Sequence, residues 1–305
     1  MFSYIIRRLI YSIGVILGVS VLVFALMHLS GDPAALLLPP EASAEDIDAF
    51  AHAMGFDRPV YVQYASFLSR ALRGDFGKSL GYGRPALGVV LERVPATLQL
   101  GATAMLVGLA IGVPAGLLSA LKRDSLSDSV AMVFTLLGQA VPDFWLAIVL
   151  ILVFAVNLRL LPASGRGGVQ YLILPAFTLG VYPAAVITRL LRSSLLEVMG
   201  CEYIVVARAK GLTERLIIYR HALRNAAIPV VTVLGLQLGR ILSGAMIIEQ
   251  VFAYPGMGRL ALYAIESRDY ALVQVFVILA AIMVTTANLL ADIAYLVLDP
   301  RIGYD

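Results

Sequence analysis

Residues 73–79 read RGDFGKS, a stretch in which three signatures of binding or chemistry overlap. It contains an Arg-Gly-Asp tripeptide, the Asp-Phe-Gly of protein kinases and the Gly-Lys-Ser that ends a phosphate-binding loop. A phosphate-binding loop also needs a glycine five residues before the Gly-Lys-Ser, where this chain has Leu72. The catalytic loop and the lysine motif that accompany a kinase Asp-Phe-Gly are missing as well. We therefore interpret the stretch as a turn that binds no nucleotide.

Other reactive side chains are too sparse for a catalytic or metal site. The chain has one cysteine, Cys201, so the sequence predicts neither a disulfide framework nor a thiolate metal cluster. Its three histidines, His28, His52 and His221, are scattered. A net charge of +3 without a basic block argues against a nucleic-acid partner. We expect no catalytic residues, no metal and no cofactor on this chain.

The composition indicates a chain that lies in a bilayer. Of its 305 residues, 60% are hydrophobic and 14% are charged, whereas a soluble domain carries about 25% charged residues. A membrane helix needs roughly 20 apolar residues. Six stretches qualify: residues 9–29, 96–121, 130–157 (interrupted by Pro142-Asp143), 171–191, 226–248 and 272–298. The predicted fold is therefore all-α with six transmembrane helices, the first retained because its apolar core is too long for a signal peptide.

The distribution of lysine and arginine predicts the orientation of these helices. If the N-terminus is cytoplasmic, the inner segments hold Arg7, Arg8, Lys122, Arg123, Arg189, Arg192, Arg208, Lys210, Arg215, Arg220, Arg224 and Arg301. The two short outer loops then hold Arg159, Arg166, Arg259 and Arg268. The segment 31–95 is long enough to cross the membrane largely regardless of its charge. We expect both termini, including a tail at 299–305, in the cytoplasm.

The outer segment, residues 31–95, is amphipathic and predicts two helices. Ser43 can cap the first, with acidic residues in its opening turns. Pro59 can start the second, whose apolar face would hold Val60, Tyr64, Phe67, Leu68 and Leu72. In the second span, Gly108, Gly112 and Gly116 recur every four residues, which predicts close helix packing inside the chain or against a second membrane subunit. Pro114, Pro142 and Pro183 predict kinks in their helices.

The cytoplasmic segment CEYIVVARAKGLTERLIIYRHALRNAAIP, residues 201–229, predicts a pair of short helices. Residues 202–210 form the first, with Gly211 at its C′ position. Thr213 can cap the second, which carries Leu216, Ile217 and Tyr219. Helices this short are marginal in water, so their apolar faces must be covered. Either they lie on the chain's own spans or on lipid, or they insert into a groove on a cytoplasmic partner.

This segment resembles the EAA loop of ABC importer permeases. The matching residues are Ala207-Arg208-Ala209-Lys210-Gly211, followed by His221-Ala222-Leu223-Arg224-Asn225-Ala226. Val205-Val206-Ala207 stands where the general loop has Glu-Ala-Ala, which is similar to the dipeptide/oligopeptide/nickel branch of the family. Further matching phrases along the chain are Gly31-Asp32-Pro33, Gly74-Asp75-Phe76-Gly77, Pro142-Asp143-Phe144-Trp145, Gly235-Leu236-Gln237-Leu238-Gly239, Tyr254-Pro255-Gly256-Met257-Gly258-Arg259, Arg268-Asp269-Tyr270 and Asp299-Pro300-Arg301.

The resemblance implies a multi-pass permease of the bacterial inner membrane that imports peptides, or nickel chelates, glutathione or opines. It divides the chain into a first helix (1–30), an extracytoplasmic segment (31–95), a five-helix core (96–298) with a coupling loop (192–225), and the tail. The implied partners are a homologous second permease, two cytoplasmic ATPases that carry ATP and Mg, an extracytoplasmic substrate-binding protein and lipid. The implied ATPase contacts are Glu202, Tyr203, Ala207, Arg208, Ala209, Lys210, Gly211, Leu212, His221, Arg224 and Asn225.

Two charges inside the spans are candidates for the substrate path. Charged residues within a membrane usually face a cavity or a partner. Asp143 and Arg240 are predicted at matching depths, so they form a structural ion pair, line the path for a zwitterionic peptide, or do neither. Asp292 lies nearer the inner end, where we expect it to cap or pair locally, and its different depth argues against an intramembrane aspartyl protease.

The alternative function, from another class of transporter, is ion-driven secondary transport. It would require inverted repeats and buried ion-binding carboxylates beside broken helices. No clear repeat is visible, and Asp143 is the one central acid. Dependence of transport on ATP separates the two classes.

Overall fold

The structure, a computed structural model, describes residues 2–29, 38, 42–55 and 57–298, and these form helices and turns without a β-strand. Gly31-Asp32-Pro33 and the tail at 299–305 lie outside the described residues. Four helical stretches are long and apolar enough to cross a membrane: Ile6–Leu26, Ala86–Leu121, Gln170–Met199 and Tyr270–Ile293. Two bent helix pairs bring the number of candidate spans to as many as six. The expected all-α membrane fold is confirmed at this level.

The described chain forms two compact units. One contains Leu98–Tyr254 with the described parts of Met1–Ile5 and Ala287–Asp305, and we call it the core unit. The other contains the described parts of Ile6–Thr97 with Pro255–Thr286, and we call it the outer-segment unit. Each unit has buried apolar clusters of its own.

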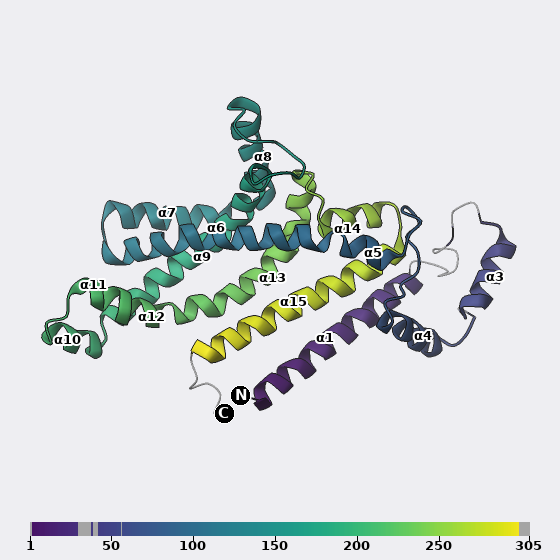
Figure 1. Ribbon diagram of the computed structural model, residues 1–305, viewed down its shortest axis with the longest axis horizontal. Coiled ribbons are helices and arrows are strands. Elements are labelled where there is room, and N and C mark those ends of the chain that lie inside the picture. Colours follow the sequence, from purple (N-terminus) through teal and green to yellow (C-terminus); the bar gives the residue numbers. More distant parts are fainter. Residues whose placement is uncertain (1, 30–37, 39–41, 56, 299–305) are drawn as a thin grey trace. The chain divides into compact units, whose positions relative to one another are not determined.

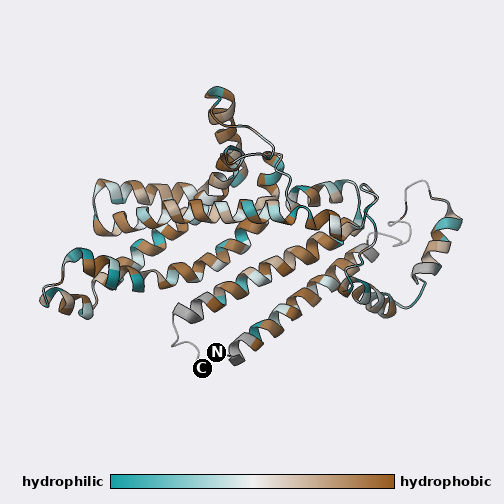
Figure 2. Ribbon diagram, in the orientation of Figure 1, coloured by the Kyte–Doolittle hydropathy of each residue, from teal (hydrophilic) through white to brown (hydrophobic). Residues whose placement is uncertain are grey.

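Helix α9 (Gln170–Met199) is the centre of the core unit (Figure 1). Helices α6 (Val94–Leu121), α7 (Leu126–Ala140) and α13 (Ile228–Val251) pack on it. About half of the α9 side chains are buried, including Ile187, Leu191 and Leu195. Figure 2 shows the mostly apolar colouring of these helices. An apolar helix enclosed by its neighbours on most sides is typical of the interior of a membrane bundle.

The glycine repeat of α6 packs against α9 within the core unit. A Cβ atom added at Gly112 would lie 2.8 Å from the Ala184 carbonyl oxygen, and one added at Gly116 would lie 2.8 Å from that of Thr188. The Thr188 hydroxyl donates to the carbonyl oxygens of Ala184, at 2.8 Å, and of Gly112, at 3.3 Å. Small residues therefore let the two backbones approach, as predicted, and the partner helix belongs to the same chain.

The third predicted span is sharply broken. Helix α7 ends at Ala140, and α8 (Asp143–Leu150) continues as a π-helical turn, η1 (Ile151–Asn157). The two parts are bent by 107°. Pro142 occupies the N-cap of α8, so the proline marks the break, but the change of direction is far larger than the predicted kink. Pro114 and Pro183 lie inside α6 and α9, which continue through them.

The outer-segment unit contains α1 (Phe2–Leu29), α3 (Ala44–Met54), α4 (Val60–Leu72), α5 (Ala86–Leu91), α14 (Met257–Glu266) and most of α15 (Tyr270–Leu298). Ser43 forms a capping box with Asp46, and its hydrogen bonds to this carboxylate lower the pKa of Asp46. On α4, Phe67 is buried against Phe24 of α1. Val60 and Leu72, at the two ends of the predicted apolar face, are exposed.

The RGDFGKS stretch forms a turn that is anchored by its serine. Gly74 and Gly77 adopt positive φ angles of 78° and 83°, which glycine allows without strain. The Ser79 hydroxyl donates to the carboxylate of Asp269, at 2.6 Å, and both residues are buried. The Gly81 amide donates to the same oxygen, at 3.2 Å. The serine therefore satisfies a buried aspartate, which agrees with the prediction of a structural turn.

Candidate functional site

The first helix of the cytoplasmic loop, α10 (Glu202–Ala209), ends in a left-handed glycine turn. Gly211 has φ +78° and its amide donates to the Arg208 carbonyl oxygen, at 2.9 Å. The Leu212 amide donates to the Ala207 carbonyl oxygen, at 3.3 Å. These two bonds form the Schellman motif, which uses carbonyl groups that a helix end leaves free. The predicted C′ role of Gly211 is confirmed.

The second part of the loop runs through α11 (Glu214–Leu216), the π-helical turn η2 (Ile217–Ala222) and α12 (Leu223–Ala226). Thr213 occupies the N-cap of α11, but its side chain makes no capping hydrogen bond, unlike the prediction. Arg208 pairs with Glu214 across the turn, at 2.6 Å. The hydrogen bond to Glu214 raises the pKa of Arg208. The pair joins the two helices on an exposed face, where such pairs stabilise only modestly.

One face of the loop is anchored on the core unit. Ile204, Ala207 and Ile217 are buried in a cluster with Leu191 and Leu195 of α9. Covering these side chains supplies the tertiary packing that such short helices need. The alternative in which the loop lies against the chain's own spans therefore holds for this face.

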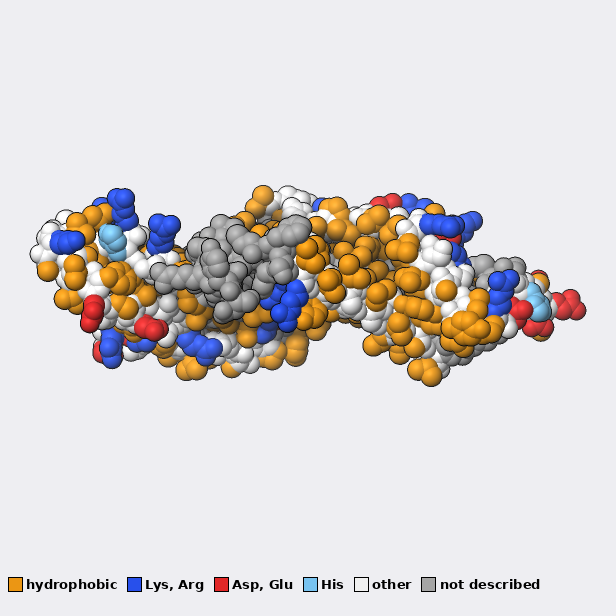
Figure 3. Space-filling model, turned by 90° about the horizontal axis from the view of Figure 1, so that it is seen from below, with side chains coloured by type: hydrophobic (Ala, Val, Ile, Leu, Met, Phe, Trp, Pro, Cys, Tyr) orange, Lys and Arg blue, Asp and Glu red, His pale blue; other side chains and the backbone are white. Residues whose placement is uncertain are grey.

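Other apolar side chains of the loop are exposed. The exposed side chains are Tyr203, Val205, Val206, Leu216 and Tyr219. Figure 3 shows Lys and Arg side chains gathered at the end of the molecule that carries α10 and α11. A small apolar patch with a basic rim is typical of a protein-binding surface. We call these five residues the loop patch.

The predicted contact residues divide between the two faces. Ala207 is buried on the anchored face, and Leu212 and His221 are half-buried. The others are exposed: Glu202, Tyr203, Arg208, Ala209, Lys210, Gly211, Arg224 and Asn225. The Asn225 side-chain amide donates to the Tyr203 hydroxyl, at 2.8 Å, and ties the first and last turns of the loop together. Val205 and Val206 are also exposed and were not among the predicted contact residues, although α10 carries apolar residues on more than one side.

A charged clamp beside the loop was also missed. Arg192 of α9 donates to both carboxylate oxygens of Asp128, at 2.7 Å each. The Ser119 hydroxyl of α6 donates to the same carboxylate, and the Asp124 amide does so at 3.0 Å. The clamp joins α6, α7 and α9. The sequence signal was Ser125, which caps α7 three residues before Asp128.

The structure brings Asp143 and Arg240 together. The Arg240 Nη2 lies 3.9 Å from the Asp143 Oδ2, and the guanidinium carbon lies 3.1 Å from the ring centre of Tyr182. The Arg240 side chain is 46% exposed and that of Asp143 is 28% exposed. Gly244 lies beside the carboxylate. The arrangement holds a cation at a tyrosine face with a carboxylate counter-ion.

No group of three or more His, Cys, Asp or Glu side chains within the described ranges is arranged to hold a metal ion. The candidate spans, together with a short-helix loop anchored at one end of a helical bundle, are typical of a multi-pass membrane protein.

Comparison with known proteins identifies the family. Residues 112–304 match the family described as "Binding-protein-dependent transport system inner membrane component", and residues 1–101 match the corresponding N-terminal family. The chain belongs to this family of binding-protein-dependent inner-membrane transport components. It is therefore a multi-pass permease subunit of the inner membrane, as the resemblance implied.

Curated relatives match over their full lengths. The chain is 40% identical over 305 residues to the glutathione transport system permease protein GsiC of Escherichia coli (strain K12), and 37% identical over 316 residues to the oligopeptide transport system permease protein AppB of Bacillus subtilis (strain 168). Each alignment covers 100% of both chains.

A solved structure of an inward-facing MetNI methionine ABC transporter matches with a TM-score of 0.57 and 21% identity, covering 69% of this chain and 96% of that one. At this identity the match shows a shared fold.

Proposed function

We propose that the chain is the permease subunit of an ATP-driven importer that carries peptides, including glutathione-sized ones, into the cytoplasm. Full-length similarity to a glutathione permease and an oligopeptide permease supports this cargo class. Nickel chelates and opines are the alternative cargoes within the same branch. The substrate-binding protein selects the cargo, so the permease need only accept the class.

The proposed topology has six spans with both termini inside. It counts each bent helix pair as one span, in agreement with the bias of lysine and arginine. The working assembly contains this chain, a homologous second permease, two cytoplasmic ATPases that carry ATP and Mg, and an extracytoplasmic substrate-binding protein. ATP hydrolysis is assigned to the partner ATPases because RGDFGKS in this chain is not a complete phosphate-binding loop.

The loop patch is the proposed docking site for an ATPase, and it is the observation that carries the mechanism. Exposed Val205, Val206 and Tyr219 enter a groove on the ATPase, while Ile204 and Ile217 hold the other face of the loop on α9. When ATP closes the ATPase dimer, the loop moves with it. The movement passes directly to α9 and rocks the permeases between inward-open and outward-open states.

Arg240 is the proposed cargo contact. A charge inside a span that is nearly half exposed needs a water-filled path or a partner beside it. Tyr182 and Asp143 hold its guanidinium in place from behind. A cation fixed in this way attracts the carboxylate of a peptide. The interaction is weak enough for the carboxylate to leave again.

Reconstitution tests the class of transporter. The purified assembly in sealed vesicles should accumulate labelled glutathione or dipeptide when ATP and the substrate-binding protein are supplied on their proper sides. An ionophore that dissipates ion gradients should leave uptake unchanged. Uptake that survives without ATP and stops with the ionophore would establish a secondary transporter instead.

Docking is tested by Val206→Asp, which places a charge in the loop patch. Membrane insertion should be normal, because Val206 is exposed, whereas co-purification of the ATPases should be lost. Leu126→Asp, which places the same charge at an exposed apolar residue at the start of α7 and outside the loop, is the matched control. Full ATPase binding by the Val206 variant would contradict the proposed docking face.

A further inference from the structure

The outer-segment unit has an apolar groove of about 300 Å³ between α1 and α15, with the end of α14 as its third wall. Leu22 of α1 and both Val273 and Val277 of α15 line its length. Phe24 of α1 and Ile278 of α15 belong to one buried cluster, which holds the two helices together. We call this cavity the α1–α15 groove, and it is separate from the loop patch and from the pair of intramembrane charges.

The mouth of the groove lies where both apolar spans end. The candidate span in α1 ends at Leu26 and the one in α15 begins at Tyr270, and both residues line the groove. Arg268, two residues before the α15 span, also lines it and is exposed. A tyrosine and an arginine at the end of an apolar span are typical of the level of the lipid headgroups. The groove therefore runs from headgroup level into the hydrocarbon.

The turn that carries Arg268 is fixed by its neighbour Asp269. The buried carboxylate of Asp269 accepts hydrogen bonds from the Ser79 hydroxyl, at 2.6 Å, and from the amides of Gly81 and Leu272, at 3.2 Å each. This carboxylate is therefore committed to holding the turn. No acidic side chain lines the groove, so its one lining cation favours an anionic ligand.

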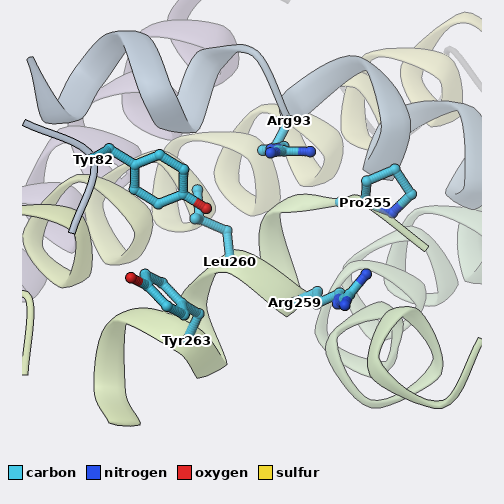
Figure 4. A pocket seen from close by; sticks show the side chains of 7 residues that line it. Tyr82, Arg93, Pro255, Arg259, Leu260 and Tyr263 are labelled. Carbon is cyan, nitrogen blue, oxygen red and sulfur yellow. The ribbon is translucent and has the colours of Figure 1, made fainter. Parts of the chain in front are cut away.

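The wall formed by α14 is also held in place. This helix supplies Ile265 to the groove. Figure 4 shows Tyr263 of the same helix beside Tyr82, and their rings meet edge to face with centres 5.7 Å apart. The Met257 amide at the start of the helix donates to the Thr97 hydroxyl oxygen, at 2.8 Å. The groove is therefore bounded by elements whose positions are fixed by specific contacts.

We propose that the α1–α15 groove binds an anionic phospholipid, with the phosphate on Arg268 and one acyl chain along Leu22, Val273 and Val277. A guanidinium group can donate two parallel hydrogen bonds to phosphate oxygens. A zwitterionic lipid brings its own ammonium group to the same arginine, so a lipid with a net negative charge is preferred. The bound chain supplies packing to α1, which has the least buried of the four long candidate spans. The proposal requires only that α1 and α15 cross the membrane.

A photoreactive benzoylphenylalanine in place of Leu22 tests the proposal in the complete assembly. The assembly is reconstituted into vesicles of equal parts phosphatidylglycerol and phosphatidylcholine and irradiated, and mass spectrometry measures the lipid adducts of this chain. Phosphatidylglycerol adducts should outnumber phosphatidylcholine adducts about fivefold, because one arginine near the membrane surface favours an anionic lipid by about that factor. The same probe at Leu106, an exposed residue of α6 outside the groove, is the matched control and should show no preference.

Arg268→Gln should abolish the preference at Leu22, whereas Arg268→Lys should keep part of it, because lysine retains the charge without the planar fork. A second measurement needs no change at Arg268: when diacylglycerol, which lacks the phosphate, replaces phosphatidylglycerol, the preference should disappear. Equal ratios at Leu22 and Leu106, or a preference that survives Arg268→Gln or the loss of the phosphate, would refute the proposal. Cross-links from Leu22 to another subunit in place of lipid would also refute it, by showing that a protein covers the groove.

Discussion

The turn at Gly211 depends on a backbone conformation that only glycine adopts without strain. Its φ of +78° and the hydrogen bond from its amide to the Arg208 carbonyl oxygen set the angle between the two parts of the loop. Any residue with a side chain costs about 1–2 kcal/mol in this region. Proline is excluded outright, because its φ is fixed near −65° and it has no amide hydrogen to donate.

Gly211→Pro should therefore abolish uptake and uncouple ATP hydrolysis from the presence of cargo. Uptake and ATPase assays of the reconstituted assembly measure both effects. Gly200→Ala is the matched control, since Gly200 lies at the other end of α10 with an ordinary φ of −84°. Gly211→Asn should keep most activity, because asparagine tolerates the left-handed region. Normal uptake by the proline variant would contradict the proposed role of Gly211 as a hinge.

Exchange of the charges at Asp143 and Arg240 separates a packing role from a transport role. In the double variant Asp143→Arg/Arg240→Asp the ion pair is restored in reverse, so membrane level and thermal stability should stay near those of the wild type. Uptake should fall by at least about tenfold, because a carboxylate now faces the cargo carboxylate. Wild-type uptake by the exchanged chain would assign the pair to structure alone.

At the scale of the elements, the close approach of α6 to α9 leaves no room for an added side-chain atom. Gly112→Ala should lower the stability of the membrane-extracted protein by about 1–3 kcal/mol, because its Cβ would collide with Ala184 and Ile187. Gly18→Ala in α1 is the matched control, since no atom lies within 4 Å of its added Cβ. There alanine should be neutral or stabilising by up to about 1 kcal/mol. Thermal unfolding in detergent compares the two, and equal effects would contradict the packing argument.

Hydrophobic length and capping residues predicted the long helices, the α3 cap and the Gly211 turn, because these features are local. The break at Pro142 was located but its size was not, since a proline permits a bend and the neighbours of α8 decide its angle. Helices α5 and α14 were missed. Both are short, and their stability comes from the buried cluster of Val89, Leu260 and Leu272, which joins distant parts of the sequence.

The candidate site, like the fold, was predicted only in part from the sequence. Family resemblance pointed to the loop, and matching depths pointed to Asp143 and Arg240, which the structure places 3.9 Å apart. The split of the loop into an anchored face and an exposed face could not be read from α10, because Ile204 and Val205 are equally apolar. Which of them is covered depends on where α9 ends.

At the scale of the whole molecule, the single cysteine provides a test of orientation. Cys201 occupies the N-cap position of α10 and is partly exposed, and no other thiol competes for a label. A membrane-impermeant maleimide should modify it in inside-out vesicles and not in intact spheroplasts. Ser66→Cys in a Cys201→Ser background, on the exposed side of α4, should show the opposite pattern. Labelling of Cys201 from outside would reverse the proposed topology.

The loop and α9 share one buried cluster, so the loop cannot move without α9. Ile204 and Ile217 are as deeply enclosed as Leu195, so sliding the loop without shifting the helix would open voids in a close-packed interior. A 30-residue helix spans about 45 Å at 1.5 Å per residue. In the proposed mechanism, a movement of the loop is therefore transmitted along α9 across the bilayer, and a mutation that loosened the shared cluster should raise ATP hydrolysis without transport before it weakens cargo binding.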